Sequence, residues 1–265
     1  MRIGCQVGVW KGGDIETVVR AIGKVGVAGV ETFTTQLAPY HKEPERFRAL
    51  LEEAELTLSG AYFNSKEFIN PDAEEAVAKQ AAADCDFLAA VGGEFLVVNG
   101  GVWKGDEPRA FSDEDFAQLA NVLNRIGADA IDRGVNAVVH PHLKCMVETP
   151  ADVDRLVEAG LDQSQVGLCV HASHQFHIGA DPYAIYEKHA DWVDYAHIGD
   201  ADANQKGTFL GQGVLDQKRL MKPLLDTGFD GWIIIECGKE GVAPEDYASN
   251  AIAWLKATWP EVNWE

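Results

Sequence analysis

Basic residues are scarce in this chain of 265 residues. It has 22 lysines and arginines against 42 aspartates and glutamates, which gives a formal net charge of −20 at neutral pH. Nucleic acids and anionic membranes are bound through basic surfaces, so this balance argues against both classes of partner. It is compatible with a protein that handles a neutral or metal-bound small molecule.

Paired cysteines, a leader segment and a membrane-length apolar run are also missing. The five cysteines, Cys5, Cys85, Cys145, Cys169 and Cys237, are odd in number and show no paired spacing. We therefore expect free thiols in a reducing compartment rather than a disulfide framework. The sequence opens directly with a strand-like segment, and no apolar run approaches the ~20 residues of a transmembrane helix. These absences predict a cytoplasmic protein without a membrane partner.

A dinucleotide-binding fingerprint is absent as well. The segment after the first predicted strand, Gly8-Val9-Trp10-Lys11-Gly12-Gly13, lacks the G-x-G-x-x-G spacing of that fingerprint. This counts against a doubly wound open sheet, which is the main alternative arrangement for a chain of alternating strand-like and helix-like segments.

Such alternation is what the sequence does contain. Strands are predicted at residues 3–7, 26–31, 56–62, 95–99, 137–139, 166–170, 192–196 and 232–235. Helices are predicted at residues 15–25, 47–54, 71–91, 112–132, 151–159, 182–190, 217–227 and 246–258. About eight such units with near-continuous apolar strands indicate a parallel sheet covered by helices. Because ~250 residues is the usual size of a TIM barrel, we predict a single (β/α)8 domain over residues 1–265.

Ligand-type side chains follow four of the predicted strands. The last four apolar runs lead into His140, His171, His197 and Glu236. In a (β/α)8 barrel the C-terminal ends of the strands meet at one face, where the catalytic residues lie. Imidazole and carboxylate groups are the ligands that borderline divalent cations prefer. The pattern therefore predicts one convergent metal site.

Short motifs surround these strand ends and resemble those of a known family. They are His140-Pro141-His142 with Val147-Glu148-Thr149, His171-Ala172-Ser173-His174, His197-Ile198-Gly199-Asp200, Gly211-Gln212-Gly213 and Gly231-Trp232-Ile233-Ile234-Ile235-Glu236. This part of the chain resembles the xylose isomerase-like TIM barrels, also called the sugar phosphate isomerase/epimerase family, and within it the inosose dehydratase-like members.

The resemblance implies a divalent cation held by strands five to eight. Many family members use Glu, Asp, His and Glu, and the matching positions here are His140, His171, His197 and Glu236. Two carboxylates are thus replaced by imidazoles, which shifts the preference from Mg²⁺ or Mn²⁺ toward Zn²⁺, Fe²⁺, Co²⁺ or Ni²⁺. The candidate metals are zinc, manganese, iron, cobalt and nickel. A histidine-lined pocket without a metal is the alternative.

The chemistry that the resemblance implies is proton abstraction next to the carbonyl of a keto-sugar or cyclitol, through a metal-stabilised enediolate. Glu236 is the predicted general base, and His174 or His142 supplies or relays the second proton. Return of the proton to carbon gives isomerisation or epimerisation, which is the main prediction. Loss of a β-hydroxyl gives a lyase reaction instead. A non-catalytic sugar-binding or accessory subunit is the alternative from another class.

The other polar and aromatic residues at strand ends are predicted to contact the substrate. They are Trp10, Glu31, Tyr62, Asn99, Asp200 and Lys206, and Trp103 is a further stacking candidate. Asp200 has two interpretations, either an acceptor that orients an imidazole or a cap for the following loop. The sequence leaves open the substrate, its phosphorylation and the oligomeric state, a homo-oligomer included.

Overall fold

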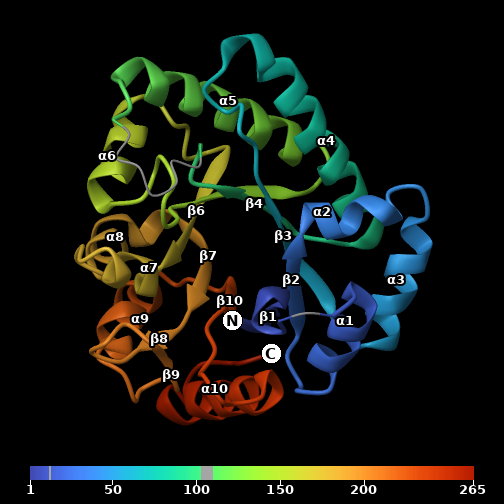
Figure 1. Cartoon of the computed structure of the whole chain (residues 1–265), viewed down its shortest axis with the longest axis vertical. Helices are drawn as coiled ribbons and strands as arrows, with labels where there is room; N and C mark the ends of the chain where they lie inside the picture. Colours follow the sequence, from blue (N-terminus) through green and yellow to red (C-terminus); the bar gives the residue numbers. More distant parts are fainter. Residues whose placement is uncertain (12, 103–109) are drawn as a thin grey trace.

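Eight parallel strands form a closed ring at the centre of the molecule (Figure 1). The computed structural model describes residues 1–11, 13–102 and 110–265. The barrel strands are Arg2–Gln6 (β1), Gly29–Phe33 (β2), Thr57–Phe63 (β3), Phe95–Asn99 (β4), Asn136–His140 (β5), Val166–His171 (β6), Val193–Ile198 (β7) and Trp232–Ile235 (β10). The ring closes where β10 pairs with β1. The predicted (β/α)8 fold is confirmed.

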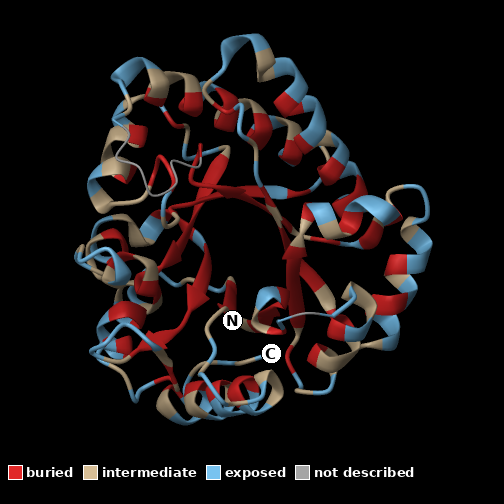
Figure 2. Cartoon of the chain, in the orientation of Figure 1, coloured by how far each residue is buried: buried red, intermediate tan, exposed pale blue. Residues whose placement is uncertain are grey.

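Helices surround the strand ring on its outside (Figure 1). Those at the predicted positions are Ile15–Gly23 (α1), Pro44–Glu53 (α3), Glu74–Val91 (α4), Asp113–Ile131 (α5), Pro150–Glu158 (α6), Ala184–His189 (α8), Gln217–Asp226 (α9) and Pro244–Thr258 (α10). Single 3₁₀ turns occupy Val7–Val9, Ala38–Tyr40, Pro71–Ala73 and Ala190–Trp192. The strands are buried and the outer helix faces are exposed (Figure 2). In the part of the chain that the structure describes, no helix has the length and apolar character needed to span a bilayer.

Capping residues and a glycine determine where these helices begin and end, close to the predicted positions. Ser112 caps α5 in a capping box, in which its hydroxyl accepts from Asp115 N and the Asp115 carboxylate accepts from Ser112 N. Thr149 and Asp152 form the same box at α6. Gly92 ends α4 with a φ of 76°, a left-handed conformation that glycine adopts without steric cost.

Besides the 3₁₀ turns, two helices and one hairpin were not predicted from the sequence, and each follows a barrel strand. They are the short helices Thr34–Leu37 (α2) and Ala172–His177 (α7), and the hairpin of Asp200–Ala201 (β8) with Gly207–Thr208 (β9). None is long enough to show the periodicity by which helices and strands are recognised. The helix α7 matters for the site, because it carries His174.

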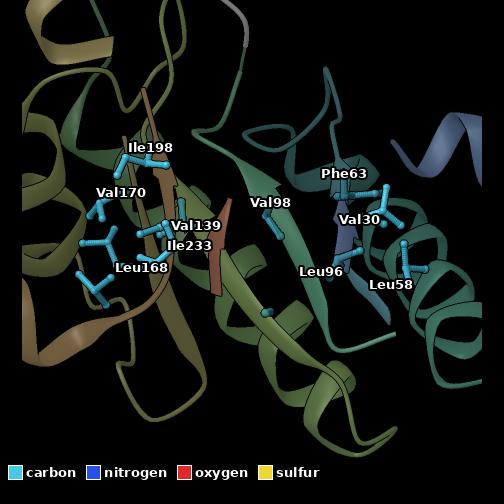
Figure 3. Close-up of a cluster of buried hydrophobic side chains, with 14 of the residues drawn as sticks. Val30, Leu58, Phe63, Leu96, Val98, Val139, Leu168, Val170, Ile198 and Ile233 are labelled. Atoms are coloured by element: carbon cyan, nitrogen blue, oxygen red, sulfur yellow. The ribbon is translucent and has the colours of Figure 1, made fainter. Parts of the chain in front are cut away.

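The apolar residues of the strands divide into two packed layers. Alternate residues on a strand point to opposite faces, so one strand can contribute to both layers, as β4, β5, β6, β7 and β10 do. The outer layer, between strands and helices, includes Val30, Leu58, Leu96, Val139 and Ile233 (Figure 3). The inner layer fills the barrel with Phe95, Val97, Val138, Cys169, Tyr195, Trp232 and Ile234.

Candidate metal centre and active site

The predicted ligands continue the inner rows of the barrel. In a strand, a residue two positions beyond an inward-facing one also faces inward. His140 follows Val138 at this spacing, and His171, His197 and Glu236 in the same way follow the inner-layer residues Cys169, Tyr195 and Ile234. All four therefore point to the barrel axis at its C-terminal end, above the apolar layer that closes the barrel below them.

These four side chains converge on one point. Each offers one ligand atom, and the four atoms lie within 4.8 Å of one another. Glu236 Oε2 is 2.8 Å from His171 Nδ1 and 2.7 Å from His197 Nδ1. None of these three atoms, nor His140 Nε2, has a hydrogen-bond partner, although all are buried. Buried polar atoms are normally hydrogen-bonded, so four that face each other without a bond indicate room for a ligand.

The outer nitrogen of each histidine is held by a different partner. His140 Nδ1 donates to the carbonyl oxygen of Cys169 at 3.2 Å. His197 Nε2 lies 2.8 Å from Glu31 Oε2, and His171 Nε2 bonds to the hydroxyl of Ser173. A proton on each outer nitrogen leaves the inner nitrogen with a lone pair. Outer partners of this kind fix the tautomer and the ring orientation of metal-binding histidines. Three imidazoles and one carboxylate so arranged fit a divalent cation such as zinc.

Burial and charge change the pKa values of these groups in different directions. Burial lowers the pKa of His171 and holds that of His140 well below its usual value, which favours the neutral imidazole that a cation requires. Burial acts in the same sense on His197, but the Cys169 side chain, Glu31 and Glu236 outweigh it and raise the pKa well above its usual value. Burial would raise the pKa of Glu236, yet His197 and His171 hold it well below its usual range.

Two further histidines adjoin the ligand group. The ring centroid of His174 lies 4.1 Å from that of His171 and 4.5 Å from that of His142. His174 Nδ1 is buried and has no hydrogen-bond partner, and burial holds the pKa of this imidazole well below its usual value. His140, His142 and His174 form a second group whose ligand atoms lie within 4.8 Å of one another. The structure therefore brings both predicted proton-transfer histidines to the ligand group.

Tyr62 and Asn99 complete the histidine side of the site. The Tyr62 ring lies 5.9 Å from His140 and 6.0 Å from His142, measured between ring centroids. Its hydroxyl donates to Asn99 Oδ1 at 2.8 Å, and Asn99 Nδ2 donates to Asn64 Oδ1 at 3.3 Å. Both predicted substrate-contacting residues thus lie beside the histidines.

A cavity of about 700 Å³ opens beside Glu236. Its described lining comes from the segments after β1 and β10 and from the β8–β9 hairpin, and it includes Lys206 and Lys239. This volume suits a small-molecule ligand. Lys206 lies 3.7 Å from Glu240 and is largely exposed at the cavity. Trp10 is buried, and its indole donates to Glu245 Oε1 at 3.0 Å.

Asp200 is bonded to the loop that follows it. Its carboxylate accepts from the amides of Ala201, Gly211, Gly213 and Leu215 at 2.9–3.3 Å. A Cβ on Gly213 would lie 2.0 Å from Asp200 Oδ1, so only glycine allows this close approach. Of the two interpretations of Asp200, the loop cap is the one for which the structure provides contacts.

The contacts of Ser173 and Glu31 were not predicted from the sequence. Ser173 stood in a quoted motif but was assigned no role, because nothing in the spacing shows that its hydroxyl bonds to His171. Glu31 was expected to contact substrate, whereas the structure buries it completely beneath His197 Nε2. His189 bonds to Asp154 on the outside of the barrel. Trp103 lies outside the described residues.

Comparisons with known proteins find similar chains whose names include dehydratases and epimerases. The inosose dehydratase of Lacticaseibacillus casei is 28% identical over 271 residues, which cover 91% of this chain and 90% of the relative. The structure of the 3-keto-D-glucoside 4-epimerase YcjR from E. coli superposes with a TM-score of 0.75 at 24% identity, covering 97% of this chain and 99% of that one. The IOLI protein, crystallised with a zinc atom, gives a TM-score of 0.78 at 14% identity and covers 98% of this chain and 99% of that one.

A family model matches nearly the whole chain. The model described as xylose isomerase-like TIM barrel matches residues 19–258, which include every strand except β1. Its fold is the closed barrel described above, and the matched segment contains all four residues of the ligand group. The chain belongs to the xylose isomerase-like TIM barrel family.

Proposed function

We propose that this protein is a metal-dependent lyase. It removes the proton next to the carbonyl of a keto-sugar or keto-cyclitol and expels a β-substituent, water in the simplest case. The observation that carries the proposal is the group of four buried, unpartnered ligand atoms with the unpartnered His174 Nδ1 beside it. A divalent cation held there would polarise the substrate carbonyl and stabilise the negative charge that develops on its oxygen.

His174 is the residue assigned to proton abstraction. Its Nδ1 is buried and has no hydrogen-bond partner, so in the tautomer with the proton on Nε2 this nitrogen can accept a proton. Glu236, the base expected from the sequence, lies with Oε2 within 2.8 Å of two imidazole nitrogens, and this position suits a ligand better than a base. A well-placed general base typically contributes about 10²–10⁴-fold to the rate.

The arrangement of the proton-carrying groups favours elimination over epimerisation. His142 lies in the loop after β5 and His174 in the helix α7 after β6, and their ring centroids are 4.5 Å apart. One imidazole can take the proton from carbon while its neighbour donates a proton to the departing oxygen on the same side of the substrate. The dehydratases among the relatives agree with this outcome.

A second candidate function is isomerisation or epimerisation, the main prediction from the sequence. Isomerisation needs one group that moves the proton between neighbouring carbons, and epimerisation needs a proton-carrying group on each face of the reacting carbon. Glu236 lines the cavity on the β10 side, and His174 approaches from β6, so the two could serve as such a pair. The epimerases among the superposed structures share only the fold at this level of identity.

The test is exchange and product analysis in deuterated water with the metal-loaded protein. A panel of inososes and 3-keto-sugars is expected to incorporate deuterium next to the carbonyl and to yield an unsaturated ketone, which is detected by its ultraviolet absorption. Recovery of a deuterated epimer without an unsaturated product would support the second candidate. Metal binding with no exchange in any substrate would leave the non-catalytic sugar-binding alternative.

The variant that tests the base is His174→Gln. It is expected to lower kcat about 10²–10⁴-fold while the bound metal stays stoichiometric. His189→Gln is the matched control, because His189 bonds to Asp154 on the outer helix layer and should leave kcat unchanged. A His174→Gln variant with native kcat would remove His174 from the mechanism.

A further inference from the structure

Glu31 is a carboxylate buried in the barrel interior with a metal-ligand histidine as its neighbour. It lies on β2, has no exposed surface, and places Oε2 2.8 Å from His197 Nε2. Its other oxygen, Oε1, has no hydrogen-bond partner. In the described ranges, no lysine or arginine lies within ion-pair distance of Glu31.

A buried carboxylate without a positive partner is costly. Removing an anion from water costs several kcal/mol unless a cation or several hydrogen bonds compensate for it. A cation at His197 Nδ1 requires the neutral form of that imidazole, which gives Glu31 one hydrogen bond and no charge. Because His197 Nδ1 faces the ligand group, a cation bound there would be the positive charge closest to Glu31 through the ring.

The charge of the ligand group alone does not balance that of a divalent cation. Three neutral imidazoles and Glu236 carry a total charge of −1 against the +2 of a divalent cation. Glu31 adds a second negative charge at one imidazole's distance, which makes the assembly neutral. Carboxylate–histidine pairs of this type raise the basicity of the ligand and orient its ring.

The partners of the three histidines differ in charge. The partner of His140 is the carbonyl oxygen of Cys169, and the partner of His171 is the hydroxyl of Ser173. Of these three partners, Glu31, the partner of His197, is the one that carries a charge. The three therefore form a built-in comparison in which hydrogen bonding is common to all and the negative charge is specific to His197.

We propose that Glu31 is a positioning residue for the metal centre, which holds the Nε2 proton of His197 and supplies one of the two negative charges that the imidazole-for-carboxylate replacements removed. This inference rests on the metal centre of the proposed function and deepens it. It assigns to Glu31 a role in cation affinity rather than in substrate contact. It also predicts that the centre binds a divalent cation more tightly than it would if residue 31 carried no charge.

The experiment measures Co²⁺ affinity, without substrate, by competition with a chelating dye and by the visible spectrum of bound Co²⁺. Glu31→Gln keeps the shape and an acceptor oxygen but removes the charge, and it is expected to weaken binding about 10–100-fold. Glu31→Asp keeps the charge and should lose less affinity than Glu31→Gln. Ser173→Ala, the matched control at His171, removes a neutral partner and should also lose less.

Several outcomes would overturn the inference. Native Co²⁺ affinity and an unchanged Co²⁺ spectrum in Glu31→Gln would exclude a role for the charge. A loss in Ser173→Ala equal to that in Glu31→Gln would mean that the negative charge adds nothing beyond a neutral partner. Failure of the native protein to bind Co²⁺ would remove the metal centre itself. Failure of the proposed function looks different, because Co²⁺ then binds as expected and no substrate exchanges deuterium.

Discussion

The two ends of the barrel differ in the contacts of their partly buried glutamates. At the N-terminal end, Glu94 accepts from both terminal nitrogens of the Arg2 guanidinium and, at 3.0 Å, from the indole of Trp232. The guanidinium in turn lies 4.1 Å from the centroid of the Trp232 ring. At the C-terminal end, Glu236 Oε2 has no hydrogen-bond partner and faces imidazole nitrogens that also have none.

The contacts of Glu94 stabilise the fold, whereas the group around Glu236 is available for a ligand. A carboxylate with three donors joins β1, β4 and β10 where the strands begin, and it needs nothing from outside the protein. Unpartnered buried atoms reduce stability until a ligand binds them, so they persist where a ligand is expected. In (β/α)8 enzymes the C-terminal end is the catalytic one. The comparison predicts that substitutions at the two ends have separable effects.

The largest effect is expected from Glu236→Gln. The substitution removes the anionic ligand while keeping the size of the side chain, so metal affinity should fall by at least about 100-fold and activity should be lost with it. Metal content after dialysis and Co²⁺ titration provide the measurements. At a Co²⁺ concentration of 1,000 Kd the native protein should gain about 4 kcal/mol of stability, most of which the variant loses.

The matched control is Glu94→Gln, the same change at the other end of the barrel. It should retain stoichiometric metal and native Co²⁺ affinity. Equal losses of metal in the two variants would mean that the glutamates act through general stability, and the contrast between the two ends would no longer hold.

The position of the ligand group could be predicted from the sequence because it depends on topology alone. Four apolar runs ended in His140, His171, His197 and Glu236, and parallel strands of a barrel place such ends together. The strand and helix bounds followed from apolar runs, capping residues and glycines, which act within a few residues of one another. These features are therefore determined by residues that lie close to them in the sequence.

Other features of the site depend on contacts that local sequence does not encode. Glu31 and His197 are 166 residues apart and lie on β2 and β7, which are not neighbours in the strand order, so no pairing rule connects them. Asp200 was a site candidate by position, but its four amide donors come from a loop whose path is irregular. The helix α7 is six residues long and too short for a periodic signal.

A smaller effect, on stability alone, is expected from Glu94→Ala. The change leaves the buried indole N–H of Trp232 and the Arg2 guanidinium without their acceptor, which should reduce the free energy of unfolding by about 1–3 kcal/mol. Urea denaturation of the metal-free protein measures it. Glu75→Ala, at the exposed pair with Arg125, is the control and should cost less than about 1 kcal/mol. A loss of Co²⁺ affinity in Glu94→Ala would show that the two ends are coupled.

The smallest effect is expected at a third place, outside the barrel, where a carboxylate is also buried. Asp84 on α4 is 3% exposed, with His41 Nε2 3.3 Å from one oxygen and Gln80 Nε2 3.3 Å from the other. Burial raises the pKa of Asp84, although Gln80 and His41 oppose this shift. The folded state therefore holds the proton to a higher pH than the unfolded state does. The native protein should lose stability as the pH rises through the raised pKa.

Asp84→Asn removes the ionisation and should flatten this pH dependence. The variant and the native protein should have similar stability at a pH where the carboxyl is protonated in both folded and unfolded states. Above the raised pKa the variant should be slightly more stable, as measured by urea denaturation across the pH range, and its Co²⁺ affinity should equal that of the native protein. Buried polar atoms thus indicate a metal centre only where several of them converge on one point. A change of Co²⁺ affinity in Asp84→Asn would contradict this conclusion.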